Sequence, residues 1–127
     1  MEGYKILIVD DEPDIRDLLA KALALEGLTN VVMAGGGAEA VALCRRERPD
    51  AVILDVMLPD GDGYQACGEI RRFSHCPILF LSSKNDEVDK LLGLAVGGDD
   101  YVTKPFSPKE VAYRVKAQLR RAAYREA

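Results

Sequence analysis

The stretch Ala51-Val52-Ile53-Leu54-Asp55 decides the fold, because four apolar residues run directly into one carboxylate. Turn-forming residues follow at once over 57–63, where Asp60 and Asp62 read as turn residues. A short apolar run bounded in this way predicts a strand buried on both faces, as in a parallel sheet. Ligands of open α/β sheets bind beyond the carboxyl ends of the strands. We therefore expect Asp55 to lie at a functional edge of the sheet.

The rest of the chain alternates similar strands with amphipathic helices. Further strands are predicted at 5–9, 30–34, 77–81 and 100–104. Helices are predicted after each strand, at about 13–26, 38–47, 64–73, 85–96 and 107–121. This alternation indicates a parallel sheet covered by helices on both faces, and right-handed crossovers leave few topologies. We expect an α/β, flavodoxin-like (βα)5 three-layer sandwich with strand order 2-1-3-4-5.

Composition sets limits on the function. A chain of 127 residues fits one domain, and its net charge of -4 does not favour nucleic-acid binding. No apolar run approaches the ~20 residues of a membrane span, and no signal-peptide pattern is present, so we expect a cytoplasmic protein without membrane contact. The cysteines Cys44, Cys67 and Cys76 have no metal-binding spacing and read as buried thiols. The single His75 gives no support to a zinc site.

Carboxylates end two of the predicted strands. Asp10 and Asp11 follow the first strand, and Asp55 ends the third. Because these strands are neighbours in the expected order, three carboxylates converge and repel one another. Mg²⁺ removes that conflict, since it prefers hard oxygen ligands. The sequence therefore predicts a magnesium site, to which the Met57 carbonyl can add an oxygen.

Other polar residues end the fourth and fifth strands. Lys104 is expected to arrive beside Asp55, although a lysine there can also be a plain ion pair. Ser82 can donate a hydrogen bond to an oxygen on Asp55, although serine at a strand end is also a common turn residue. Tyr101 lies on the fifth strand and taken alone reads as a core residue.

These residues, in this order and spacing, resemble the receiver domain of two-component response regulators. The resemblance rests on Asp10-Asp11-Glu12, on Leu-Asp-Val-Met-Leu-Pro at 54–59, on Ser82, and on Asp-Asp-Tyr-Val-Thr-Lys-Pro-Phe at 99–106. Each fragment is weak alone, but the ordered set is specific and covers nearly the whole chain.

The resemblance implies that Asp55 is a phosphoacceptor, which receives a phosphoryl group from a sensor histidine kinase. Asp10, Asp11, Asp55 and the Met57 carbonyl would hold Mg²⁺, with Mn²⁺ as an alternative. Lys104 would pair with a phosphoryl oxygen. The domain would be a signalling module that assists its own phosphorylation and dephosphorylation, and not an enzyme with a separate substrate.

The resemblance also implies a conformational switch. Ser82 would hydrogen-bond a phosphoryl oxygen, and Tyr101 would be the aromatic residue that turns inward when Ser82 moves. The Lys104–Pro105 peptide bond would be cis, as is typical of the family. The phosphoryl group adds about -1.5 to -2 charges, which can bias a bistable element nearby.

A narrower resemblance, from 90–94 through 119–121, is to the OmpR/PhoB subfamily. It implies a homodimer through the helix at 85–96, the strand at 100–104 and the last helix, although solvated helix faces would look the same. Ala95 stands where the subfamily often has an acidic residue facing the position of Lys116, so a third ion pair is expected to be missing. The expected contact residues are Lys90, Leu91, Leu94, Asp100, Glu110, Ala112 and Arg114, with cross-subunit pairs Lys90–Glu110 and Asp100–Arg114.

The domain organisation follows from the same resemblance. We expect the receiver domain at 1–122 and the start of an interdomain linker at 123–127. DNA would be contacted only through a winged-helix domain missing from this chain, as in a transcription regulator. A stand-alone receiver and an interaction module that is never phosphorylated remain alternatives.

Two other protein classes fit the sequence less well. A phosphatase of the haloacid dehalogenase type needs an aspartate two residues after its nucleophile, where this chain has Met57. A flavodoxin needs a phosphate cradle after its first strand, where Asp10-Asp11-Glu12 would repel phosphate.

Overall fold

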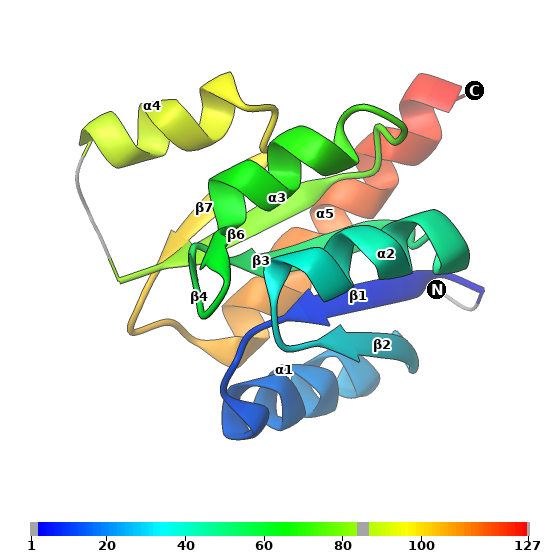
Figure 1. Cartoon of the computed structure of the whole chain (residues 1–127). Helices are drawn as coiled ribbons and strands as arrows, with labels where there is room; N and C mark the ends of the chain where they lie inside the picture. The colour runs from blue at the N-terminus through cyan, green and yellow to red at the C-terminus, as the bar shows by residue number, and fades with distance from the viewer. Residues whose placement is uncertain (1–2, 84–86, 127) are drawn as a thin grey trace.

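Five apolar strands form one parallel sheet in the computed structural model, which describes residues 3–83 and 87–126 (Figure 1). The strand order is β2-β1-β3-β6-β7, which confirms the predicted topology. The bounds are β1 (Lys5–Val9), β2 (Asn30–Ala34), β3 (Ala51–Asp55), β6 (Ile78–Ser82) and β7 (Asp100–Thr103).

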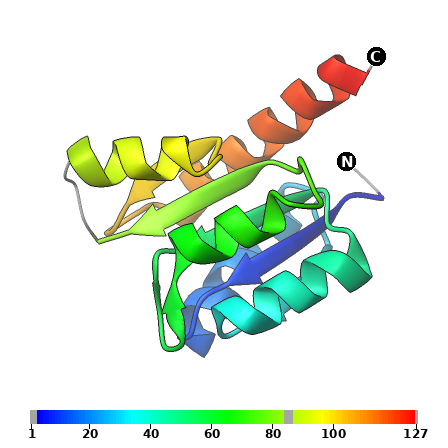
Figure 2. The same ribbon diagram turned by 45° about the horizontal axis from the view of Figure 1, so that its top comes forward.

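Helices cover both faces of the sheet, as the three-layer prediction required. Figure 2 shows α2 and α3 over one face, with α1 and α5 behind the sheet. The pleat explains the division, because successive strand side chains point to opposite faces. Thus Leu7 packs with the α2 and α3 residues, whereas Ile8 packs with those of α1 and α5. The bounds are α1 (Pro13–Leu25), α2 (Gly37–Glu47), α3 (Gly63–Ile70), α4 (Glu87–Ala95) and α5 (Pro108–Glu126).

The segment after β3 contains a hairpin that sequence analysis missed. The two-residue strands β4 (Met57–Leu58) and β5 (Gly61–Asp62) pair antiparallel within the predicted turn. The hairpin leads directly into α3. It also brings Gly63 back against β3, where a Cβ atom would collide with the carbonyl oxygen of Asp55 and lie 3.0 Å from the Val56 Cα. Only glycine allows α3 to begin this close to the end of β3.

Helix ends agree with the predictions in part. α3 ends at Ile70, shorter than predicted, and the Ser107 hydroxyl caps α5 by accepting the Glu110 N–H at 3.3 Å. Asn85, which the sequence also favours as the residue that caps the helix predicted at 85–96, lies outside the described residues. α5 continues through 123–126, where a linker was expected to begin. The division into receiver and linker therefore stays a prediction.

The described residues of α4 make few buried contacts with the rest of the molecule. Among the described side chains of this helix only Gly93 is buried, whereas Leu91, Leu92 and Leu94 are exposed. A Cβ atom at Gly93 would lie 3.2 Å from Cδ2 of the buried Phe80 ring. Among its described residues, α4 thus approaches the core through one without a side chain, and the three leucines bury little apolar surface there.

Within the described ranges, no helix combines the length and apolar character that a membrane span requires.

Candidate functional site

Three carboxylates meet at the carboxyl edge of the sheet. Val9 lies opposite Leu54 in the β1–β3 pairing, so Asp10 and Asp55 leave the sheet at adjacent points. One carboxylate oxygen from each of Asp10, Asp11 and Asp55 lies within 4.8 Å of the others. Asp10 and Asp55 are buried, and Asp11 is exposed. The predicted convergence of these three residues is confirmed.

The buried carboxylate of Asp10 lies in an unfavourable electrostatic environment. Its Oδ1 accepts the Glu12 N–H at 2.9 Å, but its buried Oδ2 has no hydrogen-bond partner among the described residues. Burial raises the pKa of Asp10 from 3.8 to about 6, and the negative charge of Asp55 adds to this, against the Glu12 N–H and the Lys104 ammonium. A buried oxygen without a partner is what a divalent cation would complete, so the donor set fits Mg²⁺.

Lys104 joins the cluster from β7, as predicted. Its Nζ lies 3.0 Å from Asp55 Oδ2 and 3.6 Å from Asp10 Oδ2. Burial lowers the pKa of Lys104, but the hydrogen bond and the charge of Asp55 outweigh it, so the pKa is raised and the side chain stays an ammonium. The Lys104–Pro105 peptide bond is cis, as expected. One ammonium facing three carboxylates leaves the cluster short of positive charge.

Backbone groups orient both buried carboxylates. The Met57 N–H donates to Asp55 Oδ1 at 3.1 Å. Arg16 on α1 donates from Nη1 to the Asp10 carbonyl oxygen at 2.7 Å, and so holds the turn that carries Asp10. Sequence analysis missed Arg16, although a single cation just after an acidic segment was a usable signal. That the Met57 carbonyl joins the metal site stays a prediction.

Asp60 and Asp62 are helix caps. The Asp60 carboxylate accepts the N–H groups of Gly37 at 2.8 Å and Ala38 at 3.0 Å, at the start of α2. These bonds from Ala38 and Gly37 lower the pKa of Asp60. Asp62 Oδ1 accepts the Gln65 N–H at 2.8 Å, at the start of α3. Both carboxylates are used structurally, and neither belongs to the acidic cluster.

Ser82 and Tyr101 lie where the sequence placed them, on β6 and β7. Ser82 is buried one residue beyond Leu81, which is opposite Asp55 in the β3–β6 pairing. Tyr101 is half-buried, and its hydroxyl lies 3.2 Å from that of Tyr64 on α3. The roles of Ser82 and Tyr101 as switch residues stay predictions.

The expected dimer face carries ion pairs within one chain. Arg114 Nη1 contacts Asp100 at 2.9 Å, and Arg114 Nε contacts Glu110 at 3.2 Å. Leu91 and Leu94 are exposed and Lys90 is half-buried. A dimer would therefore have to exchange these pairs for contacts across the interface, which gains little free energy for exposed groups.

One assignment on α5 was wrong. Ala112 is fully buried in the core between the sheet and α1, so it offers no surface to a partner; its neighbour Tyr113 is 48% exposed. Lys116 pairs with Glu26 at the end of α1, at 3.2 Å, within one chain; the expected absence of a third ion pair between Lys116 and the position of Ala95 stays a prediction. The helical periodicity is the reason, since residues 112 and 116 share the flank of α5 that faces α1.

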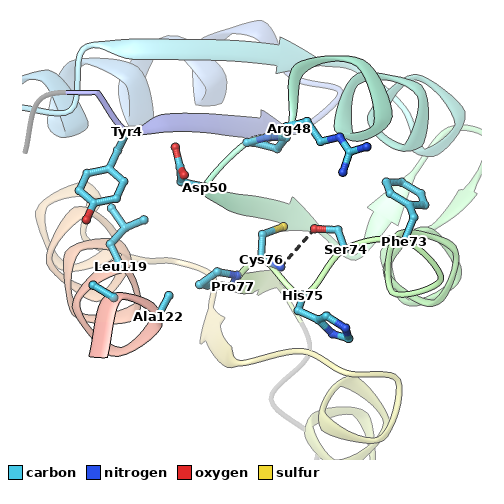
Figure 3. Close-up of a pocket in the computed structure, with 12 residues that line it drawn as sticks. Tyr4, Arg48, Asp50, Phe73, Ser74, His75, Cys76, Pro77, Leu119 and Ala122 are labelled. Atoms are coloured by element: carbon cyan, nitrogen blue, oxygen red, sulfur yellow. Dashed lines mark hydrogen bonds between the residues drawn. The ribbon is translucent and has the colours of Figure 1, made fainter. Parts of the chain in front are cut away.

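A cavity lies at the opposite edge of the sheet. It has a volume of about 340 Å³ and includes Tyr4, Asp50 and Pro77, which precede β1, β3 and β6 (Figure 3). His75 and Cys76 line it as well, and the Cys76 N–H bonds the Ser74 hydroxyl oxygen at 3.2 Å. The cavity therefore takes no part in the acidic cluster, which lies at the carboxyl ends of the strands.

The cysteines agree with their predicted structural role. Cys44 and Cys67 are buried, and burial raises the pKa of Cys44 to about 12 and that of Cys67 to about 11. Cys76 is half-buried, and burial raises its pKa as well. Thiols that stay protonated are poor nucleophiles and poor metal ligands.

Known proteins resemble this chain in sequence and structure. The family profile described as the response regulator receiver domain matches residues 6–116. The transcriptional regulatory protein YvrH of Bacillus subtilis is 45% identical over 121 residues, which are 95% of this chain and 51% of YvrH. The probable transcriptional regulator ycf27 of Guillardia theta is 51% identical over 117 residues, which are 92% of this chain and 46% of ycf27. The chain thus spans about half the length of these relatives.

A solved structure shows the same fold. The BeF3-activated receiver domain of DrrB, an OmpR/PhoB homologue from Thermotoga maritima, has a TM-score of 0.82 and 36% identity to this chain. The match covers 92% of this chain and 97% of that domain.

The raised pKa of Asp10 predicts how stability depends on pH and metal. The folded chain holds this proton more tightly than the unfolded chain, so folding stability is lost as pH rises from about 4 through about 6. Asp10→Asn removes the buried charge and keeps the oxygen that accepts the Glu12 N–H. Without metal, urea unfolding at pH 8 should show the variant to be more stable by about 1–3 kcal/mol, and the gain should vanish below about pH 4.

Asp11→Asn is the matched control, because Asp11 is exposed and pays little desolvation cost. It should not stabilise the metal-free protein, yet both variants should lose most of the stabilisation that Mg²⁺ gives the wild type. A less stable Asp10→Asn protein at pH 8 would contradict the description of the cluster as electrostatically unsatisfied.

Proposed function

Because the chain belongs to the response regulator receiver domain family, we propose that it accepts a phosphoryl group on Asp55 from a phosphohistidine of a sensor histidine kinase. Asp10, Asp11 and Asp55 would hold Mg²⁺, or Mn²⁺ in its place, which would supply positive charge to the phosphoryl oxygens. The observation that carries the proposal is the acidic cluster itself: three carboxylate oxygens within 4.8 Å, with the Lys104 ammonium 3.0 Å from Asp55.

The chemistry needs little beyond what these residues provide. The P–N bond of the phosphohistidine breaks, its electron pair stays on the imidazole nitrogen, and a P–O bond forms to Asp55. Phosphoryl transfer depends on alignment and on stabilising charge on the phosphoryl oxygens. The Met57 N–H and Lys104 fix the two oxygens of Asp55 in place. Lys104 also supplies positive charge to the phosphoryl group, as does the cation when bound. The same groups assist hydrolysis of the aspartyl phosphate.

The new charge changes the surface around α4. A phosphoryl group brings about -1.5 to -2 charges to an edge that is already short of positive charge. Ser82 moves to donate its hydroxyl to a phosphoryl oxygen, and Tyr101 turns inward on the neighbouring strand. Among the described residues of α4, Gly93 is buried and three leucines are exposed. Because so little of this described surface is packed, α4 is the element that can shift.

The shift promotes a homodimer through α4, β7 and α5. Leu91 and Leu94 form the apolar centre, and Asp100, Glu110 and Arg114 exchange their pairs within one chain for pairs across the interface. YvrH and ycf27 are named as transcriptional regulators and are about twice as long as this chain. We accordingly propose that the domain controls a DNA-binding output domain in the cytoplasm.

Phosphorylation can be tested directly. In the presence of Mg²⁺ and acetyl phosphate, intact-mass spectrometry should show one added phosphoryl group, and chelation of the metal should abolish it. Asp55→Asn should not be modified, whereas Asp60→Asn should be, because Asp60 only caps α2. An unmodified wild-type protein, or modification that persists in Asp55→Asn, would contradict the proposal.

The dimer face has its own test. Leu91→Asp should keep Mg²⁺-dependent phosphorylation but stay monomeric in sedimentation velocity under conditions where the phosphorylated wild type dimerises. Leu25→Asp is the control, since Leu25 is 86% exposed on α1, outside the proposed face. Dimerisation that survives Leu91→Asp, or that is lost in Leu25→Asp, would overturn the assignment of the interface.

A further inference from the structure

Tyr64 occupies a junction between the acidic cluster and α4. It is the second residue of α3 and follows Gly63, whose backbone packs against the Asp55 carbonyl. Tyr64 is 8% exposed, and its ring meets the Phe80 ring at 5.1 Å and 65°, an edge-to-face contact. A Cβ atom at Gly93 of α4 would lie 3.3 Å from Tyr64 Cε1. The ring is therefore packed between β6 and α4.

The Tyr64 hydroxyl makes two hydrogen bonds in different directions. It donates to the Asp89 carbonyl oxygen on α4 at 3.1 Å, and it lies 3.2 Å from the Tyr101 hydroxyl on β7. A carbonyl can only accept, so the single Tyr64 proton goes to Asp89, and Tyr101 must donate to the Tyr64 oxygen. The order is Tyr101 O–H to Tyr64 O–H to Asp89 C=O. Burial also raises the pKa of Tyr64 above its usual range, so the hydroxyl stays a donor at neutral pH.

We propose that Tyr64 is a positioning residue of the switch: before phosphorylation its hydroxyl holds Tyr101 in place and fastens it to the first half of α4, and the shift of α4 on activation breaks this link. The inference rests on the proposed function, and deepens it by adding a path from Asp55 to α4 through the β4–β5 hairpin, beside the path through Ser82. Tyr64 is not among the residues that carried the resemblance.

The hydrogen bonds from Tyr101 to Tyr64 and from Tyr64 to Asp89 matter for the position of α4 because the other contacts of this region are weak. The centroids of the Tyr101 and Phe80 rings are 6.3 Å apart in a tilted arrangement, and the described side chains of α4 bury little surface of their own. Two linked hydrogen bonds in a buried position strengthen each other. They therefore form a larger share of what holds α4 in this position than they would for a well-packed helix. Each bond is expected to change a conformational equilibrium by about 2- to 10-fold.

Tyr64→Phe tests the proposal because it removes the hydroxyl and keeps the ring that packs against Phe80 and Gly93. Because activation has to break this link, the beryllofluoride concentration that half-saturates the protein with Mg²⁺ present, followed at the Met57 amide by NMR, should fall about 2- to 10-fold. Amides at 90–93 should exchange with solvent faster by a similar factor, also without beryllofluoride, while those of α2 keep their rates. Tyr4→Phe is the control, because Tyr4 lines the cavity at the other edge of the sheet.

A double-mutant cycle separates positioning from ordinary packing. If the hydroxyls act as one chain, Tyr64→Phe and Tyr101→Phe together should lower the half-saturating concentration no more than the larger single change. Additive effects, or an unchanged concentration in Tyr64→Phe, would refute the inference while the proposed function stands. A wild-type protein that does not bind beryllofluoride would instead refute the proposed function, and hydrogen exchange at 90–93 would still decide whether Tyr64 fastens α4.

Discussion

The crowding of carboxylates where β1 and β3 leave the sheet is the interaction on which the rest of the structure depends. Parallel pairing of two buried strands brings Asp10 and Asp55 to one edge, and burial makes their charges costly. Lys104 reaches both from β7, but Asp10 Oδ2 still lacks a hydrogen-bond partner within the described chain. The fold therefore maintains a site that is electrostatically incomplete, and such a site responds strongly to a cation or to a phosphoryl group.

In the proposed switch, α4 and the loop after it are the part of the surface that shifts. α4 meets the core through Gly93, and a Cβ atom at Gly98, in the loop after the helix, would come within 2.8 Å of Phe80 Cδ2. Phe80 thus sets how closely the helix and the loop after it can approach the sheet. Polar contacts from Tyr64 and Tyr101 hold the helix where apolar burial does not. A change at Asp55 can reach this region both along the strands and through the hairpin that ends at Gly63.

The sheet and the acidic cluster could be predicted from the sequence because each rests on a strong local pattern. Buried parallel strands are continuous apolar runs, and Asp10, Asp55 and Lys104 stand directly at their ends. The β4–β5 hairpin was missed because strands of two residues carry no periodic signal. Ala112 was placed on the wrong flank of α5, since a small residue beside Val111 fits either a core or a surface position. The Tyr64–Tyr101 contact could not be predicted, because it depends on how closely α3 and β7 approach across the sheet.

The central claim is that Asp10, Asp11 and Asp55 share one cation beside Lys104. Paramagnetic broadening by Mn²⁺, which substitutes for Mg²⁺ at oxygen sites, tests this most directly. In a titration followed by amide NMR, the signals of residues 10–12, 55–57 and 104 should broaden first and recover on addition of excess Mg²⁺. Signals of 50 and 75–76, at the opposite edge of the sheet, should persist. Broadening centred elsewhere, or none at these residues, would contradict the account.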